Sequence, residues 1–78
     1  MPHISVKMLK GRTEEQKQAL SKALAKALGE TIGASDAHIS VTIEDYTALE
    51  WQDEFKKEIT DKPNAIYKAP AYDPKDLL

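Results

Sequence analysis

Residues 2–16 read PHISVKMLKGRTEEQ, and this stretch decides the fold. Apolar and polar side chains alternate over residues 3–8, which predicts a strand with one buried face. A turn follows at residues 10–12, where a glycine stands between two cations. Thr13 and Gln16 then match a capping box, in which two side chains satisfy backbone amides at the start of a helix. The stretch therefore predicts a strand, a turn and a helix in immediate succession.

The helix that starts after Thr13 is predicted to span about residues 14–32. Its apolar side chains recur at every fourth position, at Leu20, Leu24, Leu28 and Ile32. One apolar stripe of this kind is typical of a helix that packs on a sheet. Small side chains flank the stripe and should allow close packing, at Ala19, Ala23 and Ala27. Gly33 is a typical residue for the C-terminal cap of a helix.

A second strand is predicted over residues 38–44, where apolar residues alternate again at Ile39, Val41 and Ile43. A strand, a helix and a strand in one compact unit imply a right-handed crossover between two parallel strands. Thr47 and Glu50 match another capping box, which predicts a shorter helix over about residues 48–60. Beyond it, prolines at positions 63, 70 and 74 exclude a long element. Residues 66–67 and 71–72 could add short extended pairings.

These elements predict an α/β fold of the α+β kind, built on one β-α-β unit, in a single domain of residues 1–78. Two strands and two helices do not close a hydrophobic core, and a two-stranded sheet exposes both of its edges. The chain has no cysteine, so disulfides cannot stabilise it. We therefore expect a homo-oligomer, with a dimer favoured, that covers the outward face of the sheet.

The composition argues against several kinds of partner. The formal net charge is −2, with acids and bases interspersed, which does not fit a nucleic-acid or anionic-membrane surface. No apolar run is long enough to span a bilayer, and Lys7, Lys10 and Arg12 interrupt any signal-peptide core. The two histidines, His3 and His38, show no metal-binding spacing. The sequence predicts a cytoplasmic protein without a metal site.

Pro2 is the candidate for catalysis. A small residue after the initiator methionine favours removal of Met1, and the mature chain would then begin with a secondary amine. An internal proline nitrogen is an amide without basicity, so no other position offers this group. The predicted strand would fix the amine at the end of a sheet, where desolvation or a nearby cation lowers the pKa of an amine toward the working pH. Arg12, in the turn after the strand, is the candidate cation.

The opening of the chain resembles that of the 4-oxalocrotonate tautomerase family, through Pro2, the strand and the segment LKGRTEEQK at residues 9–17. The remainder is similar to a subgroup of short, dimeric bacterial tautomerases, through Trp51-Gln52, Glu58-Ile59 and the segment KAPAY at residues 68–72. The resemblance covers essentially the whole chain. It implies a β-α-β fold completed by oligomerisation and an enzyme that needs no cofactor. Pro2 would be the general base that interconverts enol and keto forms of a small unsaturated or aryl keto acid.

The resemblance also implies which residues bind the substrate. Arg12 matches the carboxylate-binding arginine of the family. Ser40 stands where the hexameric members carry a second arginine, which favours a monoacid or an aryl enol such as phenylenolpyruvate over a dicarboxylate. Ser40 could still donate a hydrogen bond. Trp51 and Phe55 are candidates for an aromatic wall, although a stripe at this spacing is more often core. His3 could tune the amine or lie in a dimer interface.

Two other functions fit the sequence. A hydratase or dehalogenase of an unsaturated acid would use the prolyl ammonium as an acid, with Glu44 or Asp45 activating water. A non-catalytic oligomerisation or binding module would bury the N-terminus in an interface. The mass of the mature chain separates the module from the enzymes, because a retained Met1 leaves the proline nitrogen acylated.

Overall fold

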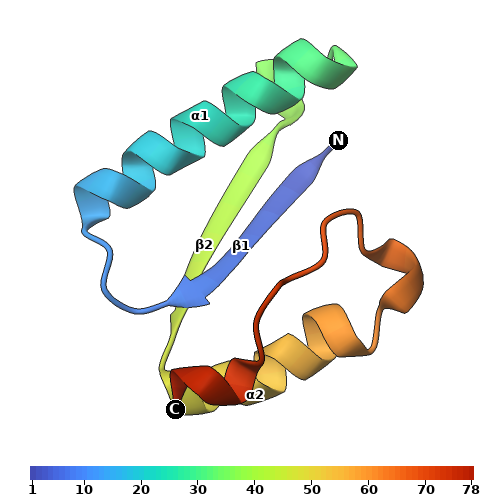
Figure 1. The fold of residues 1–78 in the computed structure, drawn as a ribbon. Helices are drawn as coiled ribbons and strands as arrows, with labels where there is room; N and C mark the ends of the chain where they lie inside the picture. Colours follow the sequence, from blue (N-terminus) through green and yellow to red (C-terminus); the bar gives the residue numbers. More distant parts are fainter. The chain divides into compact units, whose positions relative to one another are not determined.

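Two strands form the only sheet of the structure, a computed structural model that describes residues 1–78. β1 (His3–Leu9) and β2 (Ser40–Tyr46) are neighbours and run in the same direction (Figure 1). The backbone N–H of Ser40 donates to the carbonyl oxygen of Pro2 at 3.2 Å, so the pairing begins one residue before β1. The predicted parallel β-α-β arrangement is confirmed.

Contacts along the chain divide it into two compact units, Met1–Asp45 and Tyr46–Leu78. The first unit contains β1, α1 (Glu14–Ile32), the 3-10 turn η1 (Asp36–His38) and most of β2. The second contains α2 (Ala48–Phe55), the π-helical turn η2 (Lys56–Thr60) and two 3-10 turns, η3 (Pro63–Ala65) and η4 (Pro74–Leu77). None of the helices is long and apolar enough to cross a membrane.

α1 begins and ends where the sequence predicts. The hydroxyl of Thr13 accepts a hydrogen bond from the backbone N–H of Gln16 at 3.1 Å, and the N–H of Thr13 donates to Gln16 Oε1 at 2.8 Å. The capping box is therefore complete, and a cap of this kind stabilises a helix by about 1 kcal/mol. At the other end Gly33 adopts φ 72° and donates its N–H to the carbonyl of Gly29 at 2.9 Å. A side chain would strain that left-handed conformation.

The leucine row of α1 is half-buried, as predicted, and the helix runs along the sheet (Figure 1). The prediction for its flanks is wrong, because Ala19, Ala23 and Ala27 are exposed and Ile32 is 62% exposed. Each four-residue step turns about 40° around a helix with 3.6 residues per turn, so the row drifts off the packed face. The small residues on the packed side are instead Ser21, Ala25 and Gly29.

β2 begins later than predicted. Residues Asp36–His38 form η1, in which the N–H of His38 donates to the carbonyl of Ser35 at 2.9 Å. His38 is thus an exposed turn residue, and the strand starts at Ser40. From there the alternation holds, with Val41 and Ile43 half-buried and Ser40 and Thr42 exposed on the outward face.

α2 and η2 together cover the range predicted for the second helix, but the hydrogen-bond pattern changes from α to π after Phe55. Thr47 and Glu50 form a complete capping box, with hydrogen bonds of 2.8 and 3.1 Å. The α-helical part ends at Phe55, and residues 56–60 form a π turn. There the N–H of Asp61 donates to the carbonyl of Lys56 at 2.8 Å, which spans five residues instead of four.

The predicted extended pairings at residues 66–67 and 71–72 are wrong, since neither segment is a strand. The C-terminal arm contains η3 and η4 instead. Pro63 and Pro74 each open one of these turns, at a position where the missing N–H of proline costs no hydrogen bond. Asp73 caps η4, because its side chain accepts from the N–H of Lys75 at 3.0 Å.

No residue of the single chain is fully buried, and several large apolar side chains are exposed. Tyr67 is 100% exposed, and Leu49 and Leu78 are also largely in water. A chain of this size usually needs a disulfide, a metal or a partner to become stable. The absence of a closed core therefore supports the expectation that copies of the chain assemble.

We predict that the thermal unfolding midpoint rises with protein concentration, because assembly stabilises the folded chain by mass action. A hundredfold increase in concentration should raise the midpoint by roughly 5–10 °C. Circular dichroism measures the midpoint, and sedimentation velocity on the same samples reports the assembly. A midpoint that is independent of concentration in a monomeric sample would contradict the expectation.

Candidate active site

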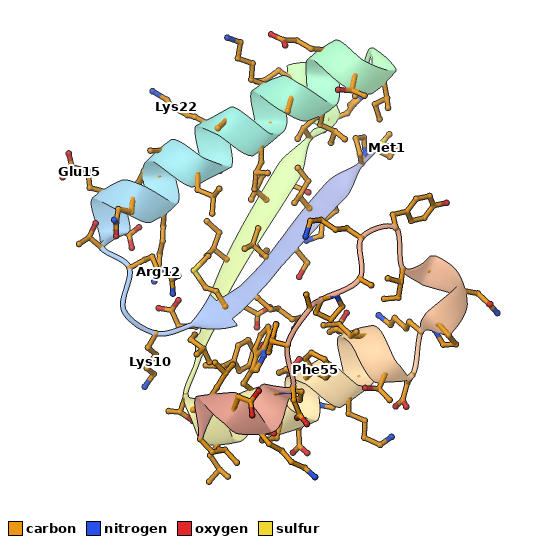
Figure 2. All side chains as sticks on the ribbon, in the orientation of Figure 1. Met1, Lys10, Arg12, Glu15, Lys22 and Phe55 are labelled. Carbon is orange, nitrogen blue, oxygen red and sulfur yellow. The ribbon has the colours of Figure 1, made fainter.

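The amino-terminal end of the sheet holds Pro2. Pro2 is half-buried, and its carbonyl oxygen accepts a hydrogen bond from the backbone N–H of Ser40 at 3.2 Å. Met1 is 87% exposed and extends beyond the strand (Figure 2). Because Met1 contributes almost no packing, its removal would leave the strand pairing intact. A chain without Met1 would therefore begin with a prolyl amine directly before β1.

His3 forms the tightest side-chain contacts near Pro2. Its Nδ1 lies 2.6 Å from Ser40 Oγ, and its Nε2 lies 3.2 Å from Thr42 Oγ1. Both hydroxyls stand on the outward face of β2, two residues apart, as neighbours on one face of a strand do. The alternation of apolar and polar residues turns all three side chains outward, but it gives no sign that they bond to one another.

Arg12 lies at the opposite end of β1 from Pro2, as the positions of Met1 and Arg12 show (Figure 2). The side chain is exposed, and its Nη1 donates to the carbonyl of Leu9 at 3.4 Å. At about 3.3 Å per residue, the strand separates Pro2 from the turn by roughly 20 Å. The base and the anchor that the sequence nominates therefore do not meet within one chain.

The carboxylates of β2 already have lysine partners. Glu44 lies 3.5 Å from Lys7 Nζ, and Asp45 Oδ2 forms an ion pair with Lys17 Nζ. The other oxygen of Asp45, Oδ1, is buried without a hydrogen-bond partner. Both carboxylates lie near the carboxyl end of β2, on the order of 15 Å along the strand from Ser40. They are remote from the Pro2 of their own chain.

The two nominated aromatic residues lie in the second unit, where they join α2 to the C-terminal arm. Trp51 packs on Tyr46 with ring centroids 6.2 Å apart, and its Nε1 donates to the hydroxyl of Tyr72 at 3.0 Å. Phe55 meets the edge of Tyr72 with centroids 5.7 Å apart. Both residues thus have a structural role in this unit. Their contact with a substrate stays a prediction.

A groove of about 900 Å³ opens beside this aromatic cluster, between α2, η2 and the arm. Phe55 and Tyr72 line it, together with Lys56 and Lys75, whereas Trp51 does not. The side chain of Gln52 closes one side, since its Nε2 donates to the carbonyls of Ala48 and Pro74 at 3.0 and 2.9 Å. No group of three or more histidine, aspartate or glutamate side chains is placed to hold a metal ion.

A protein-family model described as tautomerase enzyme matches residues 2–54, more than half of the chain, and the match begins at Pro2. The chain belongs to the tautomerase family. A probable tautomerase from Bacillus cereus is 53% identical over 45 residues, which cover 58% of this chain and 74% of the relative. A 2-hydroxymuconate tautomerase from Bacillus subtilis is 51% identical over 45 residues, covering 58% of this chain and 73% of that protein.

Solved structures of tautomerases agree with this assignment. The structure of YwhB, described as a homologue of 4-oxalocrotonate tautomerase, matches with a TM-score of 0.63 and 31% identity. That match covers 99% of this chain and 100% of the other. The resemblance found in the sequence is therefore confirmed, and so is the fold class. As a member of the tautomerase family, the chain is an enzyme of keto–enol isomerisation, which excludes the non-catalytic module.

Proposed function

We propose that Pro2, freed by removal of Met1, is the general base that interconverts the enol and keto forms of a small acid with one carboxylate. One observation carries the proposal. The family match begins at Pro2, directly before β1, where the carbonyl of Pro2 accepts a hydrogen bond from the N–H of Ser40. A secondary amine held in place can act on a bound enol without first being ordered, which lowers the barrier to proton transfer.

The reaction needs one base and no change of oxidation state. The neutral prolyl amine removes the proton from the enol hydroxyl, and the electron pair of that O–H bond forms the carbonyl. The electron pair of the carbon–carbon double bond then takes the same proton from the prolyl ammonium. The amine is regenerated, and the keto acid leaves. A base of this kind contributes about 10²–10⁴-fold to the rate.

Arg12 of a second copy is the proposed anchor for the substrate carboxylate. Within one chain roughly 20 Å of strand separates Arg12 from Pro2, which is longer than a small keto acid. A guanidinium binds a carboxylate through two parallel hydrogen bonds and orients it. The exposed side chain of Arg12 makes only one long bond, to Leu9, so it is available to a neighbouring site.

The number of arginines supports a substrate with one carboxylate. Arg12 is the only arginine in the chain, so an assembly contains one guanidinium group for each Pro2. Ser40, which replaces the second arginine of the hexameric members, is uncharged and is already bonded to His3. A dicarboxylate such as 2-hydroxymuconate, the compound in the name of the Bacillus subtilis relative, would leave one carboxylate without such a partner. A monoacid such as phenylenolpyruvate fits better.

The hydratase or dehalogenase alternative gains no support. It requires a carboxylate that can take a proton from water, and both candidates are paired with lysines. No observation favours this second function over tautomerisation.

Replacing Pro2 tests the base directly. We predict that Pro2→Ala lowers kcat for ketonisation of phenylenolpyruvate by about a hundredfold or more. Intact-mass spectrometry of the wild-type protein should show a chain that begins at Pro2. Circular dichroism and sedimentation must show that the variant folds and assembles normally. An unchanged rate in a folded variant, or an active wild-type protein that retains Met1, contradicts the proposal.

Substrate comparison tests the single carboxylate. We expect kcat/KM for phenylenolpyruvate to exceed that for 2-hydroxymuconate by about tenfold or more. The second carboxylate of 2-hydroxymuconate would lack a charged hydrogen bond, and the loss of such a bond lowers binding by about that factor. The methyl ester of phenylenolpyruvate should lose a similar factor. Arg12→Ala should weaken turnover of the acid and leave turnover of the ester unchanged. Faster turnover of 2-hydroxymuconate would overturn this part of the proposal.

Mixing two impaired variants tests the shared site. Pro2→Ala and Arg12→Ala each damage every site of their own assembly. A mixed dimer joins the intact Pro2 of one chain to the intact Arg12 of the other and so restores one site. After unfolding and joint refolding in equal amounts, we expect up to about a quarter of the wild-type activity. If activity does not recover although mass spectrometry detects mixed assemblies, base and anchor do not come from different copies.

A further inference from the structure

We propose that His3 is a positioning residue for Pro2, which it holds in place through Ser40 and Thr42. The inference rests on the proposed role of Pro2 as the base and adds a residue to that site. His3 follows Pro2 directly in the chain, and its ring contacts β2 through both nitrogens. These two contacts lie beside the backbone bond that joins Ser40 to Pro2.

The sheet by itself holds Pro2 weakly. Proline has no backbone N–H once it is part of the chain, and in the mature protein its nitrogen must stay free for catalysis. The carbonyl is therefore the only group through which Pro2 can join the ladder, and it makes one bond of 3.2 Å. Chain termini held by so few bonds usually fray. An amine that frays would be badly placed for proton transfer, because a displacement of about 1 Å can cost a hundredfold in rate.

His3 supplies the missing constraint from the neighbouring position. Its ring bridges two hydroxyls on the outward face of β2, at 2.6 Å from Ser40 Oγ and 3.2 Å from Thr42 Oγ1. Two contacts at different points along β2 limit both the sliding and the rotation of the strand end. Ser40 therefore fastens the end of β1 twice, by its backbone N–H to Pro2 and by its hydroxyl to His3.

The contact acts through geometry and does not require a charge on His3. A hydroxyl can donate or accept, so the two bonds persist whichever ring nitrogen carries the proton. The charged groups on the same face are Lys7 and Glu44, which are paired with each other further along the strands. Loss of the His3 ring should therefore lower the rate without shifting the acid limb of the pH profile, which reports the prolyl amine.

The experiment compares His3→Ala, His3→Asn and Ser40→Ala in the assembled enzyme. An asparagine places a polar atom close to the position of Nδ1 and so keeps the contact with Ser40, but it cannot titrate. We expect His3→Ala to lower kcat about tenfold to a hundredfold with KM changed less than about twofold. His3→Asn should recover most of the loss. Ser5→Ala, at a serine on the same face of β1 that is exposed in the single chain, is the matched control and should match the wild type.

A double-mutant cycle completes the test. If His3 acts through Ser40, adding Ser40→Ala to His3→Ala should cost little more than His3→Ala alone. Full activity in a folded His3→Ala variant overturns the inference. A shifted acid limb in His3→Asn also overturns it, since that result assigns His3 an electrostatic role. These outcomes are separate from the proposed role of Pro2 as the base, which fails if Pro2→Ala stays active or if an active wild-type protein retains Met1.

Discussion

The parallel pairing of β1 with β2 is the constraint on which the rest of the structure depends. Parallel strands cannot be joined by a tight turn, so α1 must carry the chain back along the sheet. That path places Pro2 beside Ser40 at one end of the sheet. It also leaves Arg12 at the other end (Figure 2). The pairing of the strands thus brings Pro2 and Ser40 together, and the length of β1 keeps the candidate residues Pro2 and Arg12 apart within one chain.

Much of this architecture could be predicted from local sequence signals. The capping boxes at Thr13 and Thr47 depend only on residues three positions apart, and both form as expected. Gly33 ends α1 for a reason that is equally local, its φ of 72°. The buried face of α1 was harder to predict, because the four-residue spacing of the leucines does not match the helical repeat over several turns. Ala19, Ala23 and Ala27 consequently lie in water.

The site itself depends on contacts between residues far apart in the sequence. Nothing in the local pattern fixes the register of β2 against β1, and a shift of two residues would keep every side chain on its face. Only the folded register shows that His3 meets Ser40 and Thr42 rather than a later pair. In the same way, Trp51 and Phe55 fit a helical stripe, but their partner Tyr72 lies on an arm without periodicity. Sequence patterns could identify these residues as candidates, but they could not predict which residues contact one another.

The length of β1 has a consequence for the assembly as a whole. Under the proposed sharing of sites, each chain gives its Pro2 to one site and its Arg12 to another, so every β1 spans two catalytic centres. The separation of those centres is then set by the seven residues of β1. A one-residue insertion would turn the following side chains to the other face of the sheet, and a two-residue insertion would move the anchor by about 7 Å. Under the proposed sharing of sites, the length of β1 therefore sets a distance in the assembly as well as in the single chain.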